Sequence, residues 1–223
     1  MEIKNKTVLI AGAGSGIGAA LASLLVSQGT IVYSVDMREP VERIPSVIYL
    51  HADLTIMSHI DAALVQIPVP VSILINCAGV MRRGTIFDST ENDYDFIMEN
   101  NLKSSWMLLK KMEKILIPNA TVVQISSGHA LVPVANPGLY TLAKIATAGL
   151  AHILAVTCPT YKVKIVYPGP TLTPLLLTER TQADQERIKK IALHPDTLAQ
   201  KISDLILSDY SELRFNYETE EYD

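Results

Sequence analysis

Short runs of hydrophobic, mostly β-branched residues alternate along the chain with longer segments in which hydrophobic residues recur every three or four positions. The short runs predict strands, and because they are hydrophobic at successive positions they predict strands that are buried on both faces. The predicted strands span residues 7–11, 31–35, 47–50, 72–76, 121–126 and 164–167. The longer segments predict helices over residues 16–28, 55–66, 91–117, 138–157 and 195–208.

Strand and helix patterns alternate regularly, and this alternation requires parallel strands joined by right-handed crossover connections. We therefore expect an α/β fold with a doubly wound parallel sheet between two helix layers, a three-layer, Rossmann-like arrangement. No repeat or low-complexity linker interrupts the alternation, so residues 1–223 are predicted to form a single domain. Residues 218–223 are acidic and lack a hydrophobic face, which predicts a flexible, solvated tail.

Composition narrows the classes of protein to which the chain can belong. Of its 223 residues, 48% are hydrophobic and 19% are charged, which is enough apolar material for a packed core. A net charge of -4 and the lack of a dense lysine or arginine run argue against a nucleic-acid partner. The polar start of the chain does not resemble a secretion signal, and no run of about 18 uncharged apolar residues predicts a membrane span.

The two cysteines, Cys77 and Cys158, lie far apart in apolar surroundings. They predict buried, reduced thiols rather than a disulfide or a metal site, as expected of a cytoplasmic protein without a metal centre. The segment from Gly138 to Val156 is hydrophobic on nearly all sides, so we expect the sheet or another subunit to cover it.

The sequence AGAGSGIG at residues 11–18 directly follows the first predicted strand. Its glycines, at positions 12, 14, 16 and 18, do not fit the pattern G-x-G-x-x-G, because residue 17 is Ile. A glycine-rich loop between a strand and a helix can place backbone N–H groups and the helix N-terminus against a pyrophosphate. Such a loop can also be only a tight turn. Other residues of the sequence are therefore needed to distinguish nucleotide binding from a purely structural turn.

Asp36, at the end of the second predicted strand, favours nucleotide binding. A carboxylate at this place can accept hydrogen bonds from the adenosine ribose hydroxyls, and it would repel a 2′-phosphate. Because residue 15 is Ser15 and the loop holds no Lys or Arg, the charges favour NAD over NADP as the cofactor. Arg38 keeps NADP possible as an alternative cofactor, since a guanidinium folded over the ribose would tolerate the 2′-phosphate of NADP.

Tyr140 and Lys144, in the sequence YTLAK, are four residues apart, so a helix places both on one face. A neighbouring ammonium favours the phenolate and lowers the tyrosine pKa from its usual value of about 10, which suits acid-base chemistry. Ser127 lies at the end of a predicted strand, where a doubly wound sheet binds its ligands. Alternatively, Tyr140 and Lys144 are solvated residues of an amphipathic helix.

Together these segments resemble the short-chain dehydrogenase/reductase family, in its shorter, non-extended branch. The family's loop has the pattern T-G-x-x-x-G-x-G, which Gly12, Gly16 and Gly18 match with Ala11 in place of Thr. The resemblance covers the chain to about residue 174 and includes NCAG, which is similar to the family's N-N-A-G segment, and PGPTLT, which is similar to its P-G-x-x-x-T segment.

The resemblance implies an oxidoreductase with a catalytic tetrad of Asn101, Ser127, Tyr140 and Lys144. In such a tetrad Asn101 supports a proton-relay water, Ser127 positions the reacting oxygen, Tyr140 exchanges the proton and Lys144 holds the nicotinamide ribose. Asn100 is a rival by one place, but the following Leu-Lys favours Asn101. The implied cofactor-binding residues are Gly12, Ser15, Gly16, Ile17, Gly18, Asp36, Asp53, Leu54, Asn76, Ala78, Gly79, Tyr140, Lys144, Pro168, Gly169, Thr171 and Thr173.

The end of the chain departs from the family pattern. Family members commonly are longer and end with a strand and a glycine-containing segment, whereas residues 214–217 predict a last strand with no glycine after it. This departure puts the subunit contact through the last strand in doubt. A homo-oligomer formed through the helices near 102–117 and 138–157 remains the expectation.

Residues 175–195 are predicted to form a mobile lid over a small-molecule substrate. The hydrophobic start of this lid, Leu175–Leu177, faces either the substrate or the sheet, and we favour packing on the sheet. Met81 and His129 lie where they can border the pocket, although core filling and an exposed loop are the ordinary roles of such residues.

The leading hypothesis is an NAD(H)-dependent oxidoreductase that acts on a secondary alcohol or ketone. The alternative is a nucleotide-binding sensor or scaffold that has lost catalysis, which the shortened end of the chain keeps open. A serine hydrolase that uses Ser127 and His129 is disfavoured, because the sequence lacks a G-x-S-x-G elbow and an obvious third member of a triad.

Overall fold

The computed structural model describes residues 2–40 and 42–223, and in this part of the chain eight strands form one sheet. Their order across the sheet is β3-β2-β1-β4-β5-β6-β7-β8, and β8 alone among them runs antiparallel to its neighbour. The strands are β1 (Thr7–Ala11), β2 (Ile31–Asp36), β3 (Val47–His51), β4 (Val71–Asn76), β5 (Leu116–Ile125), β6 (Lys162–Tyr167), β7 (Glu212–Asn216) and β8 (Glu221–Tyr222). The order reverses between β1 and β4, which is where an open α/β sheet binds its ligands.

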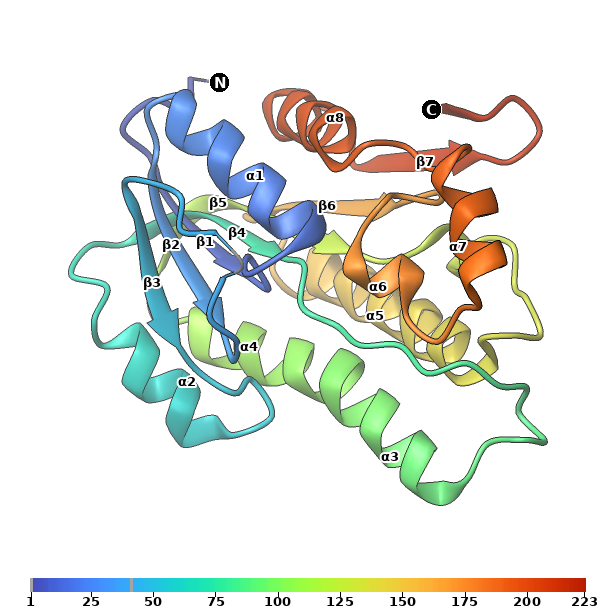
Figure 1. The fold of residues 1–223 in the computed structure, drawn as a ribbon. Helices are drawn as coiled ribbons and strands as arrows, with labels where there is room; N and C mark the ends of the chain where they lie inside the picture. The colour runs from blue at the N-terminus through green and yellow to red at the C-terminus, as the bar shows by residue number, and fades with distance from the viewer. Residues whose placement is uncertain (1, 41) are drawn as a thin grey trace.

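Helices cover both faces of the sheet, with α1 and α8 on one face and α2, α4 and α5 on the other (Figure 1). The helices are α1 (Gly16–Ser27), α2 (Met57–Leu64), α3 (Glu91–Met98), α4 (Ser104–Met112), α5 (Gly138–Thr157), α6 (Pro174–Leu177), α7 (Gln182–Lys189) and α8 (Pro195–Leu207). The predicted three-layer, doubly wound α/β fold is therefore confirmed.

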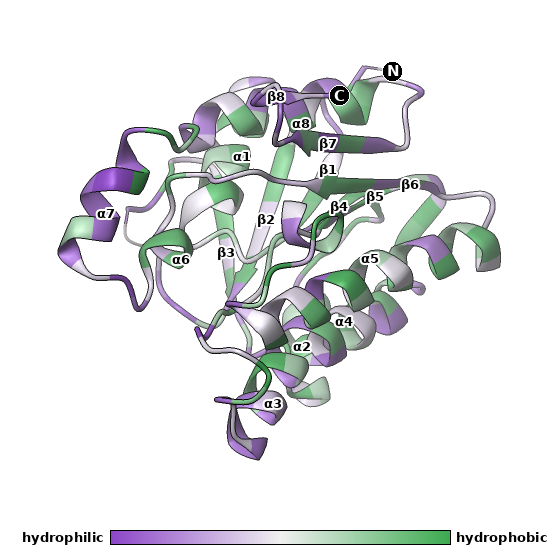
Figure 2. Cartoon of the chain, turned by 90° about the vertical axis from the view of Figure 1, so that its right-hand side faces the viewer, coloured by the Kyte–Doolittle hydropathy of each residue, from purple (hydrophilic) through white to green (hydrophobic). Residues whose placement is uncertain are grey.

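The central strands are buried on both faces, as their continuous hydrophobic runs predict. All residues of β1 are buried, and their side chains alternate between two cores. Val8 and Ile10 pack in the core beneath α1 and α8, whereas Leu9 and Ala11 pack in the core beneath α2 and α4. The strands at the centre of the sheet are mainly hydrophobic and α7 is hydrophilic, so α7 lies outside both cores (Figure 2).

The helix predicted over residues 91–117 is interrupted and ends earlier. One turn of π-helix, Glu99–Lys103, separates α3 from α4, and α4 ends at Met112. The hydrophobic residues that follow belong to the start of β5 instead. Periodicity cannot distinguish a helical end from a strand over such a short hydrophobic run, which is why the boundary was misplaced.

The last residues of the chain differ from the predicted flexible tail. β7 extends the sheet parallel to β6, and the chain then turns back so that β8 pairs with β7. The ring of Tyr222 packs on the ring of Phe215, with 5.2 Å between their centroids. Tyr222 thus anchors this segment, while its acidic neighbours remain exposed.

α5 is long and hydrophobic enough to cross a membrane, judged by length and composition alone. One face of this helix packs on β5, β6 and the π-helix, and its buried residues include Tyr140 and Lys144. The opposite face exposes Leu142, Ile153 and Val156. The sheet therefore covers one side of α5 and leaves a hydrophobic stripe on the other.

Candidate active site

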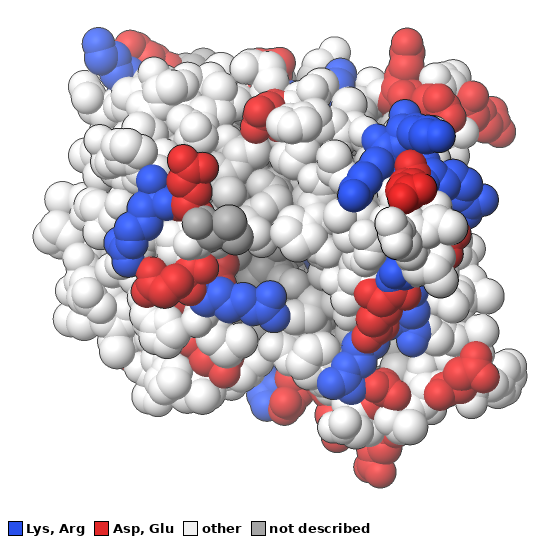
Figure 3. Space-filling model, viewed as in Figure 1, with Lys and Arg blue, Asp and Glu red and all other residues white. Residues whose placement is uncertain are grey.

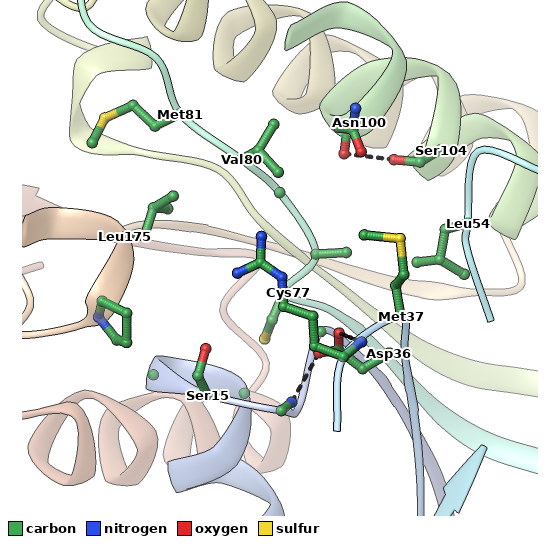
Figure 4. Close-up of a pocket in the computed structure, with 18 of the residues that line it drawn as sticks. Ser15, Asp36, Met37, Leu54, Cys77, Val80, Met81, Asn100, Ser104 and Leu175 are labelled. Carbon is green, nitrogen blue, oxygen red and sulfur yellow. Dashed lines mark hydrogen bonds between the residues drawn. The ribbon is translucent and has the colours of Figure 1, made fainter. Parts of the chain in front are cut away.

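A cleft opens at the carboxyl ends of the strands, where the strand order reverses (Figure 3). Ser15 and Asp36 lie on one side of it, and Asn100 and Ser104 lie on the other (Figure 4). The cleft consists of a larger cavity of about 520 Å³ and a smaller cavity of about 240 Å³. The two cavities adjoin each other, because they share the lining residues Ile17, Cys77, Gly79, Met81, Ile125, Thr173 and Leu175.

The glycine loop forms one end of the larger cavity, and its glycines are required for close packing. A Cβ atom on Gly12, which has a φ of +80°, would lie 2.7 Å from the backbone nitrogen of Ala78. A Cβ atom on Gly18 would lie 2.2 Å from the carbonyl oxygen of Gly12. Both contacts are with backbone atoms that cannot move aside, so side chains are excluded and the loop backbone faces the cavity.

Asp36 closes the same cavity at the tip of β2. Its Oδ2 atom accepts a hydrogen bond of 2.9 Å from the Gly14 backbone N–H, and Oδ1 accepts one of 3.0 Å from the Arg38 backbone N–H. These bonds fix the carboxylate against the glycine loop, where it can also accept bonds from a ribose. Arg38 lines the same cavity, and no ion pair holds its guanidinium among the residues that the structure describes.

Asp53 follows β3 and Asn76 ends β4, and the two residues differ in their position relative to the cavity. Asp53 lines the larger cavity, and its Oδ1 atom accepts hydrogen bonds from the backbone N–H and the hydroxyl of Thr55. Asn76 lies behind the cavity wall, where its amide donates to Ser105 and Gln124. The side chain of Asn76 therefore braces β4, whereas the other predicted cofactor-binding residues all line one of the two cavities.

Ser127, Tyr140 and Lys144 come together on the wall of the smaller cavity. Ser127 lies two residues after the end of β5. Tyr140 and Lys144 lie one turn apart on the buried face of α5. The Lys144 Nζ atom lies 5.7 Å from the centre of the Tyr140 ring and donates to the carbonyl oxygen of Ile125 at 3.2 Å. The structure thus excludes the alternative in which Tyr140 and Lys144 point into solvent.

Burial governs the protonation of this pair. Desolvation raises the pKa of Tyr140 to about 12, although a hydrogen bond with Ser127 acts in the opposite direction. Desolvation also lowers the pKa of Lys144 to about 8. In the protein alone, the pKa of Tyr140 is therefore raised by burial rather than lowered by Lys144 as we expected.

The π-helix places Asn101 behind Lys144. The Asn101 amide donates to the carbonyl oxygens of Val80 and Ile97, and its Oδ1 atom accepts from the Val80 backbone N–H. A Cβ atom on Gly79 would lie 2.6 Å from Asn101 Oδ1 and 3.3 Å from Lys144 Nζ. Asn101 lines neither cavity, so it supports the wall between α4 and the loop after β4.

The loop after β6 contributes Pro168, Gly169 and Thr171 to the smaller cavity. The end of the chain supports this loop, since the Gly169 backbone N–H donates to the Tyr222 hydroxyl at 3.1 Å. Tyr217 lines the smaller cavity directly. Our sequence analysis missed the role of the chain end, because Gly169 and Tyr222 are 53 positions apart and no local pattern predicts their contact.

Several residues near the smaller cavity were predicted with a different role or not at all. Met81 and His129 both line it, and Leu175 and Leu176 line it rather than packing only on the sheet as we favoured. Residues 175–195, the segment predicted to form a lid, consist mainly of α6, α7 and their connections, and neither helix contains a buried residue. Arg83, Arg180, Asn136 and Tyr217 are additional lining residues, which come from separate loops and share no sequence motif.

The geometry gives no support to a hydrolase. His129 contacts Ser127 through its backbone N–H, which donates to the Ser127 hydroxyl at 3.2 Å. The Nδ1 atom of the His129 ring is buried without a hydrogen-bond partner in the described part of the chain. A Ser-His-acid relay requires the imidazole itself to face both partners. Among residues 2–40 and 42–223, no group of three His, Cys, Asp or Glu side chains is placed to hold a metal ion.

The profile of the family described as short chain dehydrogenase matches residues 6–184. The oxidoreductase UcpA of Salmonella typhimurium is 29% identical over 191 residues, covering 78% of this chain and 72% of UcpA. An NAD-dependent glycerol dehydrogenase of Listeria innocua is 27% identical, covering 85% and 80% of the two chains. A short chain dehydrogenase family protein from Francisella tularensis superposes with a TM-score of 0.81 and 25% identity over 93% of both chains. The chain therefore belongs to the short-chain dehydrogenase family, and it is an oxidoreductase that acts on CH–OH or C=O groups.

Proposed function

We propose that the protein is an NAD(H)-dependent dehydrogenase or reductase for a secondary alcohol or the corresponding ketone. One observation carries this proposal: Ser127, Tyr140 and Lys144 meet in the cavity that adjoins the glycine-lined cavity. A substrate oxygen in the smaller cavity is then within the same cleft as a nucleotide in the larger cavity. Hydride transfer requires this arrangement, together with a group that moves a proton to or from the oxygen.

The larger cavity fits a dinucleotide. Its wall includes the start of α1, where the first N–H groups of a helix have no partner within the helix, and the packing at Gly12 and Gly18 leaves no room for a side chain there. The smaller cavity continues from it past Thr173 toward Ser127. When bound, the nicotinamide of the cofactor supplies the hydride acceptor or donor.

The acid-base chemistry falls to the residues of the smaller cavity. In reduction, the Tyr140 hydroxyl gives its proton to the substrate oxygen, and in oxidation the phenolate takes the proton back. The Ser127 hydroxyl donates a hydrogen bond to the same oxygen and so stabilises its charge. Lys144 supports the phenolate electrostatically and can reach a ribose hydroxyl, while Asn101 holds the wall beside it.

We infer that NAD(H) is preferred over NADP(H), because the Asp36 carboxylate lines the larger cavity at the tip of β2, where it would accept hydrogen bonds from the adenosine ribose. A 2′-phosphate would bring like charges together beside it. The relative from Listeria innocua is named as NAD-dependent, which supports this inference. Arg38 lines the same cavity and is the residue through which NADP would be accepted instead.

The substitution Tyr140→Phe tests the catalytic role. Purified protein is mixed with NADH and a panel of small ketones and aldehydes, and oxidation of NADH is followed by absorbance. We expect Tyr140→Phe to lose roughly 10²–10⁴-fold in turnover, since that is the usual contribution of a general acid-base group. NADH binding should change by less than about threefold, because the phenol proton makes no large contribution to cofactor affinity.

Unchanged turnover in Tyr140→Phe would contradict the assignment of this residue. A wild-type protein that binds NADH but oxidises it with none of the carbonyls would instead favour the sensor or scaffold. The two results separate the catalytic role from cofactor binding.

We also propose a homo-oligomer in the cytoplasm, formed through the exposed stripe of α5. Leu142, Ile145, Ile153 and Val156 recur along one face of this helix, and Val156 is 84% exposed. Light scattering should show a dimer or larger assembly for the wild type and a smaller particle for Ile153→Glu. A wild-type monomer would contradict this proposal.

A further inference from the structure

Two arginines line the smaller cavity, although the acid-base chemistry described above does not use them. Arg83 lies in the loop after β4, and Arg180 lies in the lid between α6 and α7. Both are half-buried. The space-filling view shows positive side chains gathered with acidic ones over α7 and the segment before it (Figure 3).

Neither guanidinium has a carboxylate partner within ion-pair distance among residues 2–40 and 42–223. Arg83 donates from Nε to the Thr178 carbonyl oxygen at 3.1 Å, and Arg180 donates from Nε to the Leu176 carbonyl oxygen at 2.9 Å. The Arg83 guanidinium also donates from Nη2 to the Leu176 carbonyl oxygen at 3.5 Å, so Arg83 joins the loop after β4 to the lid, whereas the Arg180 bond lies within the lid. These bonds use only part of the donor capacity, since a guanidinium has five N–H groups.

Two carboxylates, Glu179 and Asp184, lie near the two arginines, but neither contacts a guanidinium of the pair within ion-pair distance in the described structure. Glu179 accepts from the Arg83 backbone N–H at 2.7 Å rather than from the guanidinium, and its side chain faces the larger cavity. Asp184 lies 3.6 Å from Arg187 on α7. Burial is the main cause that lowers the pKa of Arg83 and that of His129; the charge of Arg180 lowers both further, and that of Arg83 adds to the shift of His129, while Glu179 and Asp184 act on Arg83 in the opposite direction. Two like charges in one half-buried cavity repel each other until an anion lies between them.

The rest of the cavity is compact and largely apolar. Leu176, Ile188 and Val134 line it, and its volume of about 240 Å³ lies below the usual range for drug-sized ligands. Tyr140 lines the same space, with its ring 6.4 Å from that of His129 in an edge-to-face arrangement. A ligand here therefore meets the acid-base group and the two arginines at once.

We propose that Arg83 and Arg180 bind an anionic group of the substrate, a carboxylate or a phosphate, so that the substrate is a compact hydroxy or oxo acid. This inference rests on the proposed function, which places the reacting oxygen at Ser127 and Tyr140. The anion and the reacting oxygen lie at opposite ends of one small molecule. Binding of the anion joins the lid to the loop after β4, because each of these segments supplies one guanidinium.

Binding to the NADH-loaded protein tests the inference without requiring turnover. The probes share one ring and differ in the attached group: benzoate, phenylphosphonate and the neutral benzamide. Their dissociation constants are measured by calorimetry on the wild type and on the variants Arg83→Met, Arg180→Met and Arg187→Met. The third variant is the matched control, because Arg187 lies on the same lid with its side chain 80% exposed.

We expect at least one anion to bind the wild type about tenfold or more tightly than benzamide, the ratio that corresponds to about 1.4 kcal/mol. The anion that binds more tightly identifies the carboxylate or the phosphate as the group that is recognised. Arg83→Met and Arg180→Met should each remove this preference, whereas Arg187→Met should retain it.

Equal binding of the anions and benzamide, or no binding of either anion, would overturn the inference. Retention of the preference in Arg83→Met and Arg180→Met would also overturn it. NADH binding is recorded first for every protein, so a failure of the proposed cofactor site is distinguished from a failure of the anion site. Thermal unfolding without probes shows whether loss of the lid contacts, rather than of anion binding, explains a variant.

Discussion

The two cavities of the cleft are built in opposite ways. The wall of the larger cavity opposite Asn100 and Ser104 is formed at the ends of β1 and β2 by backbone atoms and by side chains close to them in sequence, such as Ser15 and Asp36. The smaller cavity gathers side chains from β5, α5, the loop after β4, the lid and the end of the chain. One is therefore defined by local backbone geometry and the other by tertiary packing.

This difference predicts which cavity tolerates amino-acid substitutions and which can change its ligand. The glycine loop forms a backbone cradle, a wall made of main-chain atoms. It tolerates few substitutions, because an added side-chain atom would clash with the backbone of a neighbouring segment. A cavity assembled from separate side chains can change its ligand by substitution at one loop without loss of the fold. Three substitutions test this contrast, from the largest expected effect to the smallest.

Lys144→Met should have the largest effect, because it acts on both activity and stability. Loss of the ammonium removes support for the Tyr140 phenolate, so alcohol oxidation should fall by roughly 10²-fold or more and require higher pH. Stability should change in the other direction, since the wild-type charge is buried and the pKa of Lys144 is lowered from 10.5 to about 8. A shift of this size corresponds to at most about 3 kcal/mol.

The sign of the pH dependence follows from this shift. Below pH 8 the folded wild type holds a buried, charged lysine, so Lys144→Met should unfold at a higher temperature. As pH rises from about 8 to 10.5, the folded protein releases this proton before the unfolded chain does, and the wild type gains stability. Melting curves of both proteins across this range should converge. A constant difference, or a less stable variant at pH 7, would contradict the account.

Gly18→Ala tests the backbone cradle. The new methyl group would lie 2.2 Å from the Gly12 carbonyl oxygen, so we expect loss of about 1–3 kcal/mol in stability and a large loss of NADH affinity. Gly149→Ala is the matched control, because a Cβ atom there meets nothing within 4 Å in the described structure. The control should keep NADH affinity and gain a few tenths of a kcal/mol to about 1 kcal/mol. Equal NADH affinities in the two variants would show that the cradle does not bind the cofactor.

Tyr222→Phe should have the smallest effect. It removes the hydrogen bond from the Gly169 backbone N–H and keeps the ring contact with Phe215, so stability should fall by about 1 kcal/mol. Because Gly169 lines the smaller cavity, KM for the carbonyl substrate should rise more than the dissociation constant of NADH. Chemical denaturation and steady-state kinetics measure these quantities. An equal rise in both constants would show that the chain end supports the whole cleft rather than one cavity.

The contrast between local backbone geometry and tertiary packing also determines how much of the structure could be predicted from the sequence. The central strands and the glycine loop follow from local patterns, since buried parallel strands are hydrophobic throughout and a tight turn needs glycine. The spacing of Tyr140 and Lys144 also places them on one helix face. Each of these predictions depends on residues within a few positions of one another.

Contacts between distant segments could not be predicted in this way. Tyr217 and Tyr222 reach the site only because the chain turns back beside β7. Arg83 and Arg180 are 97 positions apart and meet only when the lid folds over the loop after β4. The raised pKa of Tyr140 likewise follows from its burial, which no spacing of residues reveals.

The most direct test of the account is a parallel titration of the wild-type protein with NADH and NADPH, read as thermal stabilisation. A ligand at 100 times its dissociation constant adds about 2.7 kcal/mol to stability, which corresponds to a shift of roughly 5–10 °C for a chain of this length. We predict that NADH stabilises the wild type and that NADPH does so only at much higher concentration, with the preference reduced in Asp36→Ser. Stabilisation by NADPH alone would contradict the role of Asp36, and stabilisation by neither would contradict the proposed cofactor site.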